Sequence, residues 1–188
     1  MKKTLFLLLA LSTVLANAQG RRNNQSFIYG EYGYSPEKGE LKAGYMAKAG
    51  YGRVFGNKGL LGKAEAFYQN YEVSYIDKQI LPYQKYGVNV NAGYSYEGLY
   101  PVMLNIWAGG YGAYESANDG NQTDPKYNAE IPTKVKGFVY GISGSAEAEI
   151  FILRRLSFTA NYTQLYDLKS KFSKSNYALS GGLRFYIN

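Results

Sequence analysis

Residues Lys85 to Glu97 alternate between apolar and polar side chains almost without interruption. A period of two residues predicts a β-strand with one apolar and one polar face. The run is long enough for a lipid-facing strand, because a tilted strand crosses a bilayer in roughly 9–11 residues. The apolar row is Tyr86, Val88, Val90, Ala92, Tyr94 and Tyr96, and the polar row is Lys85, Gly87, Asn89, Asn91, Gly93, Ser95 and Glu97.

Seven further segments follow the two-residue period and predict a total of eight strands, although the first, Gln25–Tyr34, is rich in Tyr and ambiguous in phase. They are Gln25–Tyr34, Leu41–Phe55, Leu60–Tyr75, Val102–Tyr114, Lys136–Ile150, a segment from Leu156 through Thr163, and Tyr177–Ile187.

One of these segments changes phase along its length. In Leu60–Tyr75 the outward row Ala64, Ala66 and Tyr68 is followed by Tyr71, Val73 and Tyr75. An extra residue in one strand shifts the alternation, so this change predicts a β-bulge near Gln69 or Asn70.

The connections between the predicted strands alternate between short and long. Outer-membrane barrels combine tight periplasmic turns with long external loops, whereas a soluble eight-stranded barrel has no need for this asymmetry. The pattern therefore predicts an all-β, eight-stranded, antiparallel up-and-down outer-membrane β-barrel. The short connections are Gly56–Gly59, Gly98–Pro101 and Leu153–Arg155, and the long ones are Ser35–Glu40, Ile76–Tyr83, Glu115–Thr133 and Asp167–Asn176.

The first residues have the pattern of a secretory signal peptide. A basic start at Lys2 and Lys3 precedes an apolar segment from Leu5 to Leu15 and a small-x-small site ending at Ala18. This apolar segment is too short for a membrane helix, which needs about 20 residues. We therefore expect residues 1–18 to be removed by cleavage after Ala18, which leaves a barrel domain of residues 19–188.

Composition agrees with an exported barrel. The chain has 21 Tyr and 22 Gly; tyrosine suits the lipid–water boundary, and glycine suits crowded positions in strands. The formal net charge is +7 for the full chain. It falls to +5 without Lys2 and Lys3, since 19 basic residues then oppose 14 acidic ones. This modest excess is weak support for a nucleic-acid partner, and no direct nucleic-acid binding is expected.

The polar rows of the predicted strands place charged side chains inside the barrel. A Lys or Arg facing lipid at mid-bilayer would cost roughly 2–4 kcal/mol, whereas opposite charges inside can pair. An eight-stranded interior is just wide enough for side chains to fill, so a filled core is favoured over a pore. The predicted charge network comprises Lys48, Lys63, Glu65, Lys85, Glu147, Glu149 and Arg184, with Lys63, Lys85 or Arg184 neutralising the two glutamates Glu147 and Glu149.

Enzyme and metal chemistry find little support in the sequence. The chain has no His and no Cys, so Ser-His-Asp and Cys-His nucleophile systems and His or Cys metal sites are excluded. A calcium loop starting at Asp119 would place Asp124 at the sixth position, where Gly is required. No catalytic residue, cofactor or metal site is therefore predicted.

The segment from Gly141 to Asn188 carries a resemblance to a known family. Ala146-Glu147-Ala148-Glu149 and the ending Gly182-Leu183-Arg184-Phe185-Tyr186-Ile187-Asn188 look like segments of the TraO family, which conjugative transposons of the Bacteroidetes type encode. Weaker similarity covers most of residues 19–188. Members tend to carry a Cys soon after processing, and this chain has none. The resemblance implies a non-enzymatic outer-membrane component of a conjugative DNA-transfer apparatus.

Three hypotheses of function remain open. The first is a structural barrel that contacts outer-membrane lipid and other proteins of a conjugation apparatus, at its periplasmic turns or at residues 19–24. The second is an adhesin-type surface protein that binds through the loop of residues 115–133. The third is a soluble periplasmic barrel that carries a small apolar ligand. Location in the outer membrane would exclude the third.

Overall fold

The computed structural model describes residues 23–37, 42–56, 58–74, 80–121, 123, 135–170 and 174–187. Its strands are β1 (Ser26–Ser35), β2 (Gly44–Phe55), β3 (Leu60–Ser74), β4 (Ile80–Leu99), β5 (Val102–Ala117), β6 (Lys136–Leu153), β7 (Leu156–Asp167) and β8 (Ser175–Ile187). The 3₁₀ turn η1 (Asn118–Gly120) follows β5. Among these described residues, no helix is long and apolar enough to cross a membrane.

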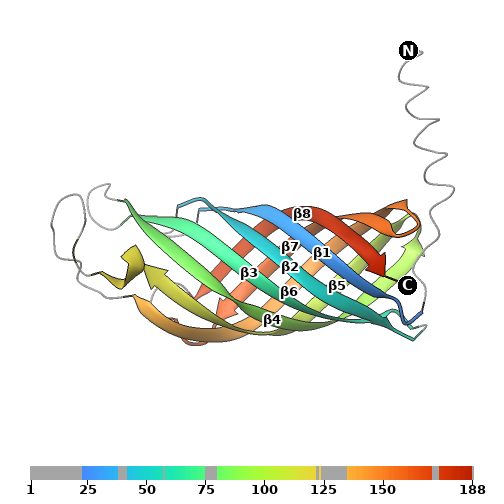
Figure 1. Ribbon diagram of the computed structural model, residues 1–188, viewed down its shortest axis with the longest axis horizontal. Helices are drawn as coiled ribbons and strands as arrows, with labels where there is room; N and C mark the ends of the chain where they lie inside the picture. Colours follow the sequence, from blue (N-terminus) through green and yellow to red (C-terminus); the bar gives the residue numbers. More distant parts are fainter. Residues whose placement is uncertain are drawn as a thin grey trace, which may run out of the picture.

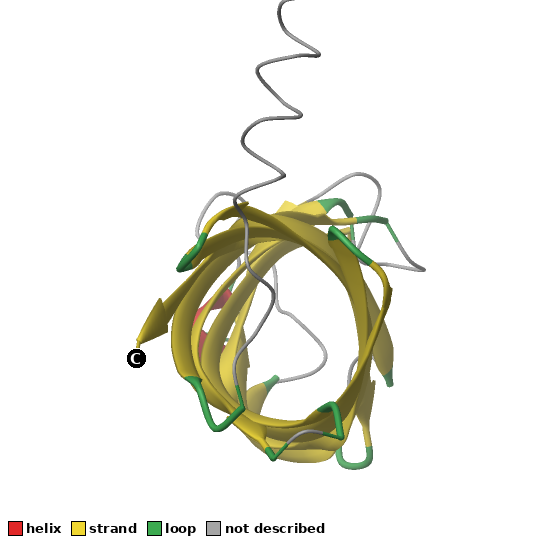
Figure 2. Cartoon of the chain, turned by 90° about the vertical axis from the view of Figure 1, so that its right-hand side faces the viewer, coloured by secondary structure: helices red, strands yellow, loops and turns green. Residues whose placement is uncertain are grey.

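The eight strands form one closed antiparallel barrel in chain order (Figures 1 and 2). Each strand pairs with its neighbours in sequence, and β1 closes the ring by pairing with β8, for example Glu31 opposite Gly182. Closure leaves no sheet edge along the paired length, which is a requirement for strands that cross lipid. The predicted eight-stranded up-and-down barrel is confirmed.

Short and long connections lie at opposite ends of the barrel (Figure 1). The turns β2–β3, β4–β5 and β6–β7 lie at one end, together with the start of β1 and the end of β8. The other end carries the four longer connections and η1. By the loop rule of bacterial barrels, the short-turn end is periplasmic and the long-loop end is external. The predicted signal peptide and its cleavage after Ala18 lie outside the described residues.

The outward rows of the strands are apolar over most of the barrel. At mid-height, Val90 and Ile106 each expose 62% of their surface, far more than a soluble protein leaves for a whole band of such residues. The inward positions beside Val90 are Asn89 and Asn91, and those beside Ile106 are Asn105 and Trp107, all of them buried. At mid-height the barrel is therefore apolar outside and mainly polar inside.

The predicted β-bulge in the third strand is wrong. The pairing of β3 with β4 runs without a shift from Leu60 to Ser74, and Gln69 and Asn70 stay in register. Tyr71 and Val73 are buried inside the barrel and do not face outward. The register shifts that the structure shows lie next to the turns, between Tyr96 and Leu99 and between Phe151 and Leu153.

Several strands are longer than their patterns predict, mostly at the external end. Strand β4 begins at Ile80, inside the expected loop Ile76–Tyr83, and β5 continues to Ala117, inside the expected loop from Glu115. The pairing Ser74 to Ile80 keeps the β3–β4 hairpin going well past its membrane-facing part. The barrel wall thus projects beyond the predicted strand ends.

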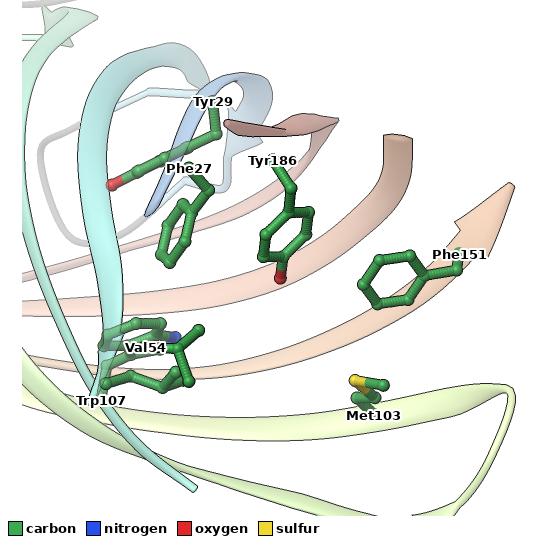
Figure 3. Close-up of a cluster of buried hydrophobic side chains, with 8 residues drawn as sticks. Phe27, Tyr29, Val54, Met103, Trp107, Phe151 and Tyr186 are labelled. Atoms are coloured by element: carbon green, nitrogen blue, oxygen red, sulfur yellow. The ribbon is translucent and has the colours of Figure 1, made fainter. Parts of the chain in front are cut away.

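An apolar plug fills the periplasmic end of the interior (Figure 3). Phe151 and Tyr186 stack with ring centroids 5.3 Å apart, and Phe27 lies 5.6 Å from Tyr186. Aromatic rings contribute large buried area and favour tilted or offset contacts of this kind. The plug consists of Phe27, Tyr29, Val54, Leu61, Met103, Trp107, Phe151 and Tyr186.

Candidate functional site

All seven residues of the predicted charge network lie inside the barrel and are buried. The structure adds three buried acidic residues that the sequence analysis left out, Glu31, Glu115 and Asp167. Among the described residues, six buried carboxylates therefore face four buried cations. Carboxylates without a cation of their own need hydroxyl or amide donors, because an unpaired buried charge is costly.

Arg184 on β8 holds two carboxylates of β6. Its Nη1 lies 2.6 Å from Glu149 Oε2, and its Nη2 lies 2.8 Å from both carboxylate oxygens of Glu147. Since one guanidinium serves two glutamates, further donors complete the cluster. Glu149 accepts hydrogen bonds from Ser157 Oγ at 2.6 Å and from Tyr186 Oη at 2.7 Å.

The plug forms one face of this cluster. The Arg184 guanidinium carbon lies 4.4 Å from the centre of the Phe27 ring, a distance at which a cation is attracted to an aromatic face. Tyr186 belongs to the plug through its ring and to the charge cluster through its hydroxyl. The charged layer and the apolar plug thus share side chains and pack as one unit.

A second cluster bridges the seam between β1 and β8 and their outer neighbours β2 and β7. Lys48 Nζ on β2 lies 2.7 Å from Glu31 Oε2 on β1 and donates to Thr163 Oγ1 on β7 at 2.9 Å. Glu31 also accepts a hydrogen bond from Ser180 Oγ on β8 at 2.9 Å. One lysine and one glutamate therefore join four strands around the closing seam.

The third ion pair lies within one strand, and its nitrogen–oxygen distance is longer than in the other ion pairs described here. Lys63 Nζ is 3.3 Å from Glu65 Oε2, and it lies 4.6 Å from the centre of the Trp107 ring. Glu65 accepts hydrogen bonds from Tyr29 Oη and from Asn89 Nδ2, the latter at 2.9 Å. Lys63 therefore contacts both the plug and the charged layer.

The fourth cluster lies toward the external end. Lys85 Nζ on β4 is 2.5 and 2.7 Å from the two oxygens of Asp167 on β7, and Tyr111 Oη donates to Asp167 Oδ1 at 2.7 Å. Glu115 receives hydrogen bonds from Tyr83 Oη at 2.8 Å and Ser170 Oγ at 3.0 Å. The Lys85–Asp167 pair crosses between non-adjacent strands, whereas Tyr83 and Glu115 lie on the neighbouring strands β4 and β5.

The structure shows which of the three expected cations neutralises Glu147 and Glu149. Of the three cations considered, Arg184 alone binds them in an ion pair. Lys63 pairs with Glu65 on its own strand, and Lys85 pairs with Asp167. Which inward residues meet depends on the stagger of the strands around the barrel, which alternation along one strand does not reveal.

Above the charge clusters the interior becomes apolar again. Tyr71, Val73, Tyr83 and Val135 form a buried cluster at the external end, with Ala117 packed against it. On β3 the outward side chain at this height, Glu72, is exposed and charged. The polarity of the wall is thus inverted relative to the lipid-facing part, as expected where the barrel leaves the membrane and is surrounded by water.

Aromatic side chains mark the level of this inversion. Tyr34 lies opposite Tyr45, Tyr68 opposite Tyr86, and Tyr86 opposite Tyr114, so tyrosines follow one another across β1 to β5. Tyrosine belts of this kind lie at the lipid–water boundary of membrane barrels. On β4, the interval from Tyr86 to Tyr96 matches the roughly 9–11 residues that a tilted strand needs to cross the bilayer.

The arrangement of these contacts holds the barrel shut. Ion pairs and hydrogen bonds run between strands at several heights, and apolar clusters lie at both ends. Within the described residues, no group of three or more acidic side chains could hold a metal ion. Residues 124–130, which make up most of the calcium loop considered from the sequence, lie outside the described part of the chain.

Glu31, Glu115 and Asp167 were missed for different reasons. Glu31 sits in a Tyr-rich strand whose phase the sequence leaves ambiguous, and its inward position is fixed by its pairing with Lys48. Glu115 and Asp167 lie in segments assigned to loops, although β5 and β7 include them. Extending the alternation of Val102–Tyr114 by one residue would have placed Glu115 inside.

Comparison with solved structures identifies the fold. The chain is similar to neisserial surface protein A (TM-score 0.59, 13% identity, 86% of this chain and 96% of that one). It also resembles the outer-membrane protein OprG of Pseudomonas aeruginosa (TM-score 0.62, 8% identity, 91% and 99%). A major outer-membrane protein of Thermus thermophilus is similar as well (TM-score 0.65, 10% identity, 88% and 100%). At these identities the likeness concerns the fold.

Sequence comparison adds no family. No protein-family model matches the chain, and no curated protein sequence matches it. The closed barrel, its apolar outer band and its likeness to outer-membrane barrels nevertheless agree with one another. A wall that is apolar outside and charged inside is built for a lipid bilayer, so the chain is a small β-barrel of the bacterial outer membrane.

Proposed function

We propose that this barrel is a non-enzymatic component of a conjugative DNA-transfer apparatus, in which it anchors partner proteins at the outer membrane. The structural part of this proposal rests on ion pairs that cross the lumen. An example is the pair between Lys85 Nζ and Asp167 Oδ1 at 2.5 Å. A lumen crossed in this way is a core that holds the barrel shut, so contacts at the barrel ends perform the function.

The assignment to conjugation rests on the resemblance to the TraO family. The segments that carry this resemblance, around Glu147–Glu149 on β6 and Arg184 on β8, meet in one ion cluster. They therefore belong to one packed unit, which supports a resemblance in the way the barrel is built. The similarity brings no catalytic residue with it.

The periplasmic turns are the proposed contact surface for partner proteins. Leu99 and Leu153 expose 53% and 58% of their surfaces at these turns, and Arg154 and Arg155 are exposed beside them. Apolar and cationic side chains together at a membrane exit suit binding to a protein with complementary acidic and apolar groups.

A deletion and complementation experiment tests the proposal. A donor strain without the gene should lose transfer of its conjugative element, and the intact gene should restore it. The double variant R154E/R155E should assemble in the outer membrane yet fail to restore transfer. K169E/K174E, which reverses two exposed charges at the external end, is the matched control and should restore it. Normal transfer by the deletion strain would refute the proposal.

A second candidate function is adhesin-type binding through the loop that follows β5. Its favouring observation is that the loop begins in a fixed turn, since Asn118 Nδ2 donates to the carbonyl oxygens of Asn121 at 3.2 Å and Thr123 at 3.1 Å. Replacement of residues 122–134 by a short Gly-Ser linker should abolish attachment to target cells if this function holds. Intact transfer in the same strain would favour this candidate over the first.

A further inference from the structure

The outer wall of the barrel carries a groove of about 430 Å³ at the external ends of β1 and β2. The groove opens beside the small side chain of Ala43, and three tyrosines surround it. The groove is lined by Tyr32, Gly33, Tyr34, Ala43, Gly44 and Tyr45.

The aromatic walls of the groove are held in place by their neighbours. Tyr32 and Tyr45 stack with ring centroids 5.7 Å apart and planes 27° apart, and Tyr68 lies 6.0 Å from Tyr45. Asn70 Nδ2 donates to the hydroxyls of Tyr45 and Tyr68, at 3.4 Å each. The walls are therefore preorganised and need little ordering when a ligand binds.

The floor is fixed as well. A Cβ atom at Gly44 would lie 2.0 Å from the carbonyl oxygen of Asn70 on the neighbouring strand, and one at Gly33 would lie 2.2 Å from that of Leu179. The strands approach too closely there for any larger residue. Both glycines lie on the inward rows of their strands, so this close approach fixes the wall behind the groove from the lumen side.

The groove opens where outer-leaflet lipid meets the barrel. Tyr34 and Tyr45 are paired members of the tyrosine belt that marks the external boundary of the bilayer. Tyr32 and Tyr34 expose 64% and 54% of their surfaces outside the barrel. A ligand at this level has to offer apolar chains toward the membrane centre and polar groups toward the outside.

We propose that this groove binds one molecule of outer-leaflet glycolipid, at the junction of its saccharide headgroup and its acyl chains. Tyrosine has an apolar ring and a hydroxyl tip, so the rings pack against the acyl stems and the flat faces of the sugar. The hydroxyl tips bond the sugar hydroxyls. Concave, mostly apolar sites with a few polar groups are typical of small-ligand binding. This site is independent of the proposed role in conjugation.

The test compares lipid retention by groove variants of the full-length barrel. Purified protein in mild detergent is mixed with a lipid A glycolipid or with phosphatidylethanolamine, and bound lipid is counted by native mass spectrometry. The unaltered barrel should keep one glycolipid and lose phospholipid. Ala43→Trp, which fills the groove, and Tyr34→Ala, which removes a wall, should each lower the affinity by about tenfold or more.

Tyr86→Ala is the matched control, because Tyr86 pairs with Tyr114 at 5.8 Å in the same belt but outside the groove. It should retain glycolipid like the unaltered barrel. Equal retention by all variants, equal loss in the control, or equal binding of both lipids would each overturn the proposal. Heat-dependent gel migration confirms folding of each variant, and Tyr34→Ala carries the test if Ala43→Trp does not fold.

Discussion

Lys85 on β4 places its ammonium 2.5 and 2.7 Å from the two carboxylate oxygens of Asp167, at the end of β7. The two strands are separated by β5 and β6 in the ring, so this ion pair spans the lumen. Both side chains are fully buried. The pair therefore ties two walls of the barrel together near the level at which the chain leaves the membrane.

Removal of one member of this pair should destabilise the barrel. Lys85→Met leaves Asp167 buried without its cation, and breaking a buried pair in this way costs about 3–5 kcal/mol. Urea unfolding in lipid vesicles would measure the loss. The double variant K85M/D167L should recover much of it, because it leaves no unpaired charge. A double variant K85M/D167L that is less stable than Lys85→Met would contradict this account.

The cluster of Arg184, Glu147 and Glu149 should also lose stability when its cation is removed, and regain it when the acidic charges are removed as well. Arg184→Met leaves Glu147 and Glu149 together with no cation, so the variant should fail to assemble or lose about 3–5 kcal/mol. The triple variant R184M/E147Q/E149Q keeps the shape and removes the charge, and it should assemble. Recovery of the folded gel band in the triple variant is the decisive measurement, and its absence would show that packing of the guanidinium matters more than charge.

The lipid-facing surface can be mapped by placing arginine on it. Val90 lies midway along β4 between Tyr86 and Tyr94, and Val90→Arg should cost roughly 2–4 kcal/mol in a bilayer. Glu72→Arg, beyond the tyrosine belt, should cost roughly 0–1 kcal/mol. Unfolding in vesicles compares the two. Equal costs would show that the tyrosine belt does not mark the membrane boundary.

Strands β1 and β8 approach each other closely at the seam that closes the barrel, so an added side-chain atom there should destabilise the fold. A Cβ atom at Gly182 would lie 2.1 Å from the carbonyl oxygen of Gly30, whereas one at Gly137 would meet nothing within 4 Å. Gly182→Ala should therefore weaken closure between β1 and β8 and cost about 1–3 kcal/mol, the usual range for overpacking. Gly137→Ala is the control and should be neutral. Thermal unfolding of both variants checks this.

The apolar plug predicts that the barrel does not conduct ions. In planar bilayers the unaltered protein should give no stable current. The variant F27A/Y186A empties part of the periplasmic end and also removes the Tyr186 hydroxyl from Glu149. It should raise the frequency of current events. Steady conductance by the unaltered protein would contradict the filled lumen.

Alternation along the chain was enough to predict the barrel and the inward position of its charges. In the membrane-crossing part, lipid outside and polar groups inside give each strand a clear two-residue period, as in Val88 and Val90 against Asn89 and Asn91. The physical cause is the high cost of a charge facing lipid. Wherever the surroundings were lipid, the apolar row faced outward.

The same rule failed where water replaces lipid. Tyr71 and Val73 were assigned outward because they are apolar, and the resulting phase change predicted a bulge that the pairing does not contain. They line the interior of the projecting wall, and Glu72 faces water. The ion-pair partners also escaped prediction, since contacts across the lumen depend on the stagger of strands that are far apart in sequence.

The polarity inversion along β3 and β4 divides one continuous hairpin into a lower part surrounded by lipid and an upper part surrounded by water. Below the level of Tyr68 and Tyr86 the hairpin is constrained by bilayer thickness, and above it by the packing of Tyr71 against Tyr83, whose ring centroids are 6.1 Å apart. Because lipid surrounds the lower part, we expect insertion to depend on that part. The upper part should therefore tolerate exchange with the tip of an unrelated barrel, so that surface recognition could diversify while the anchor is kept.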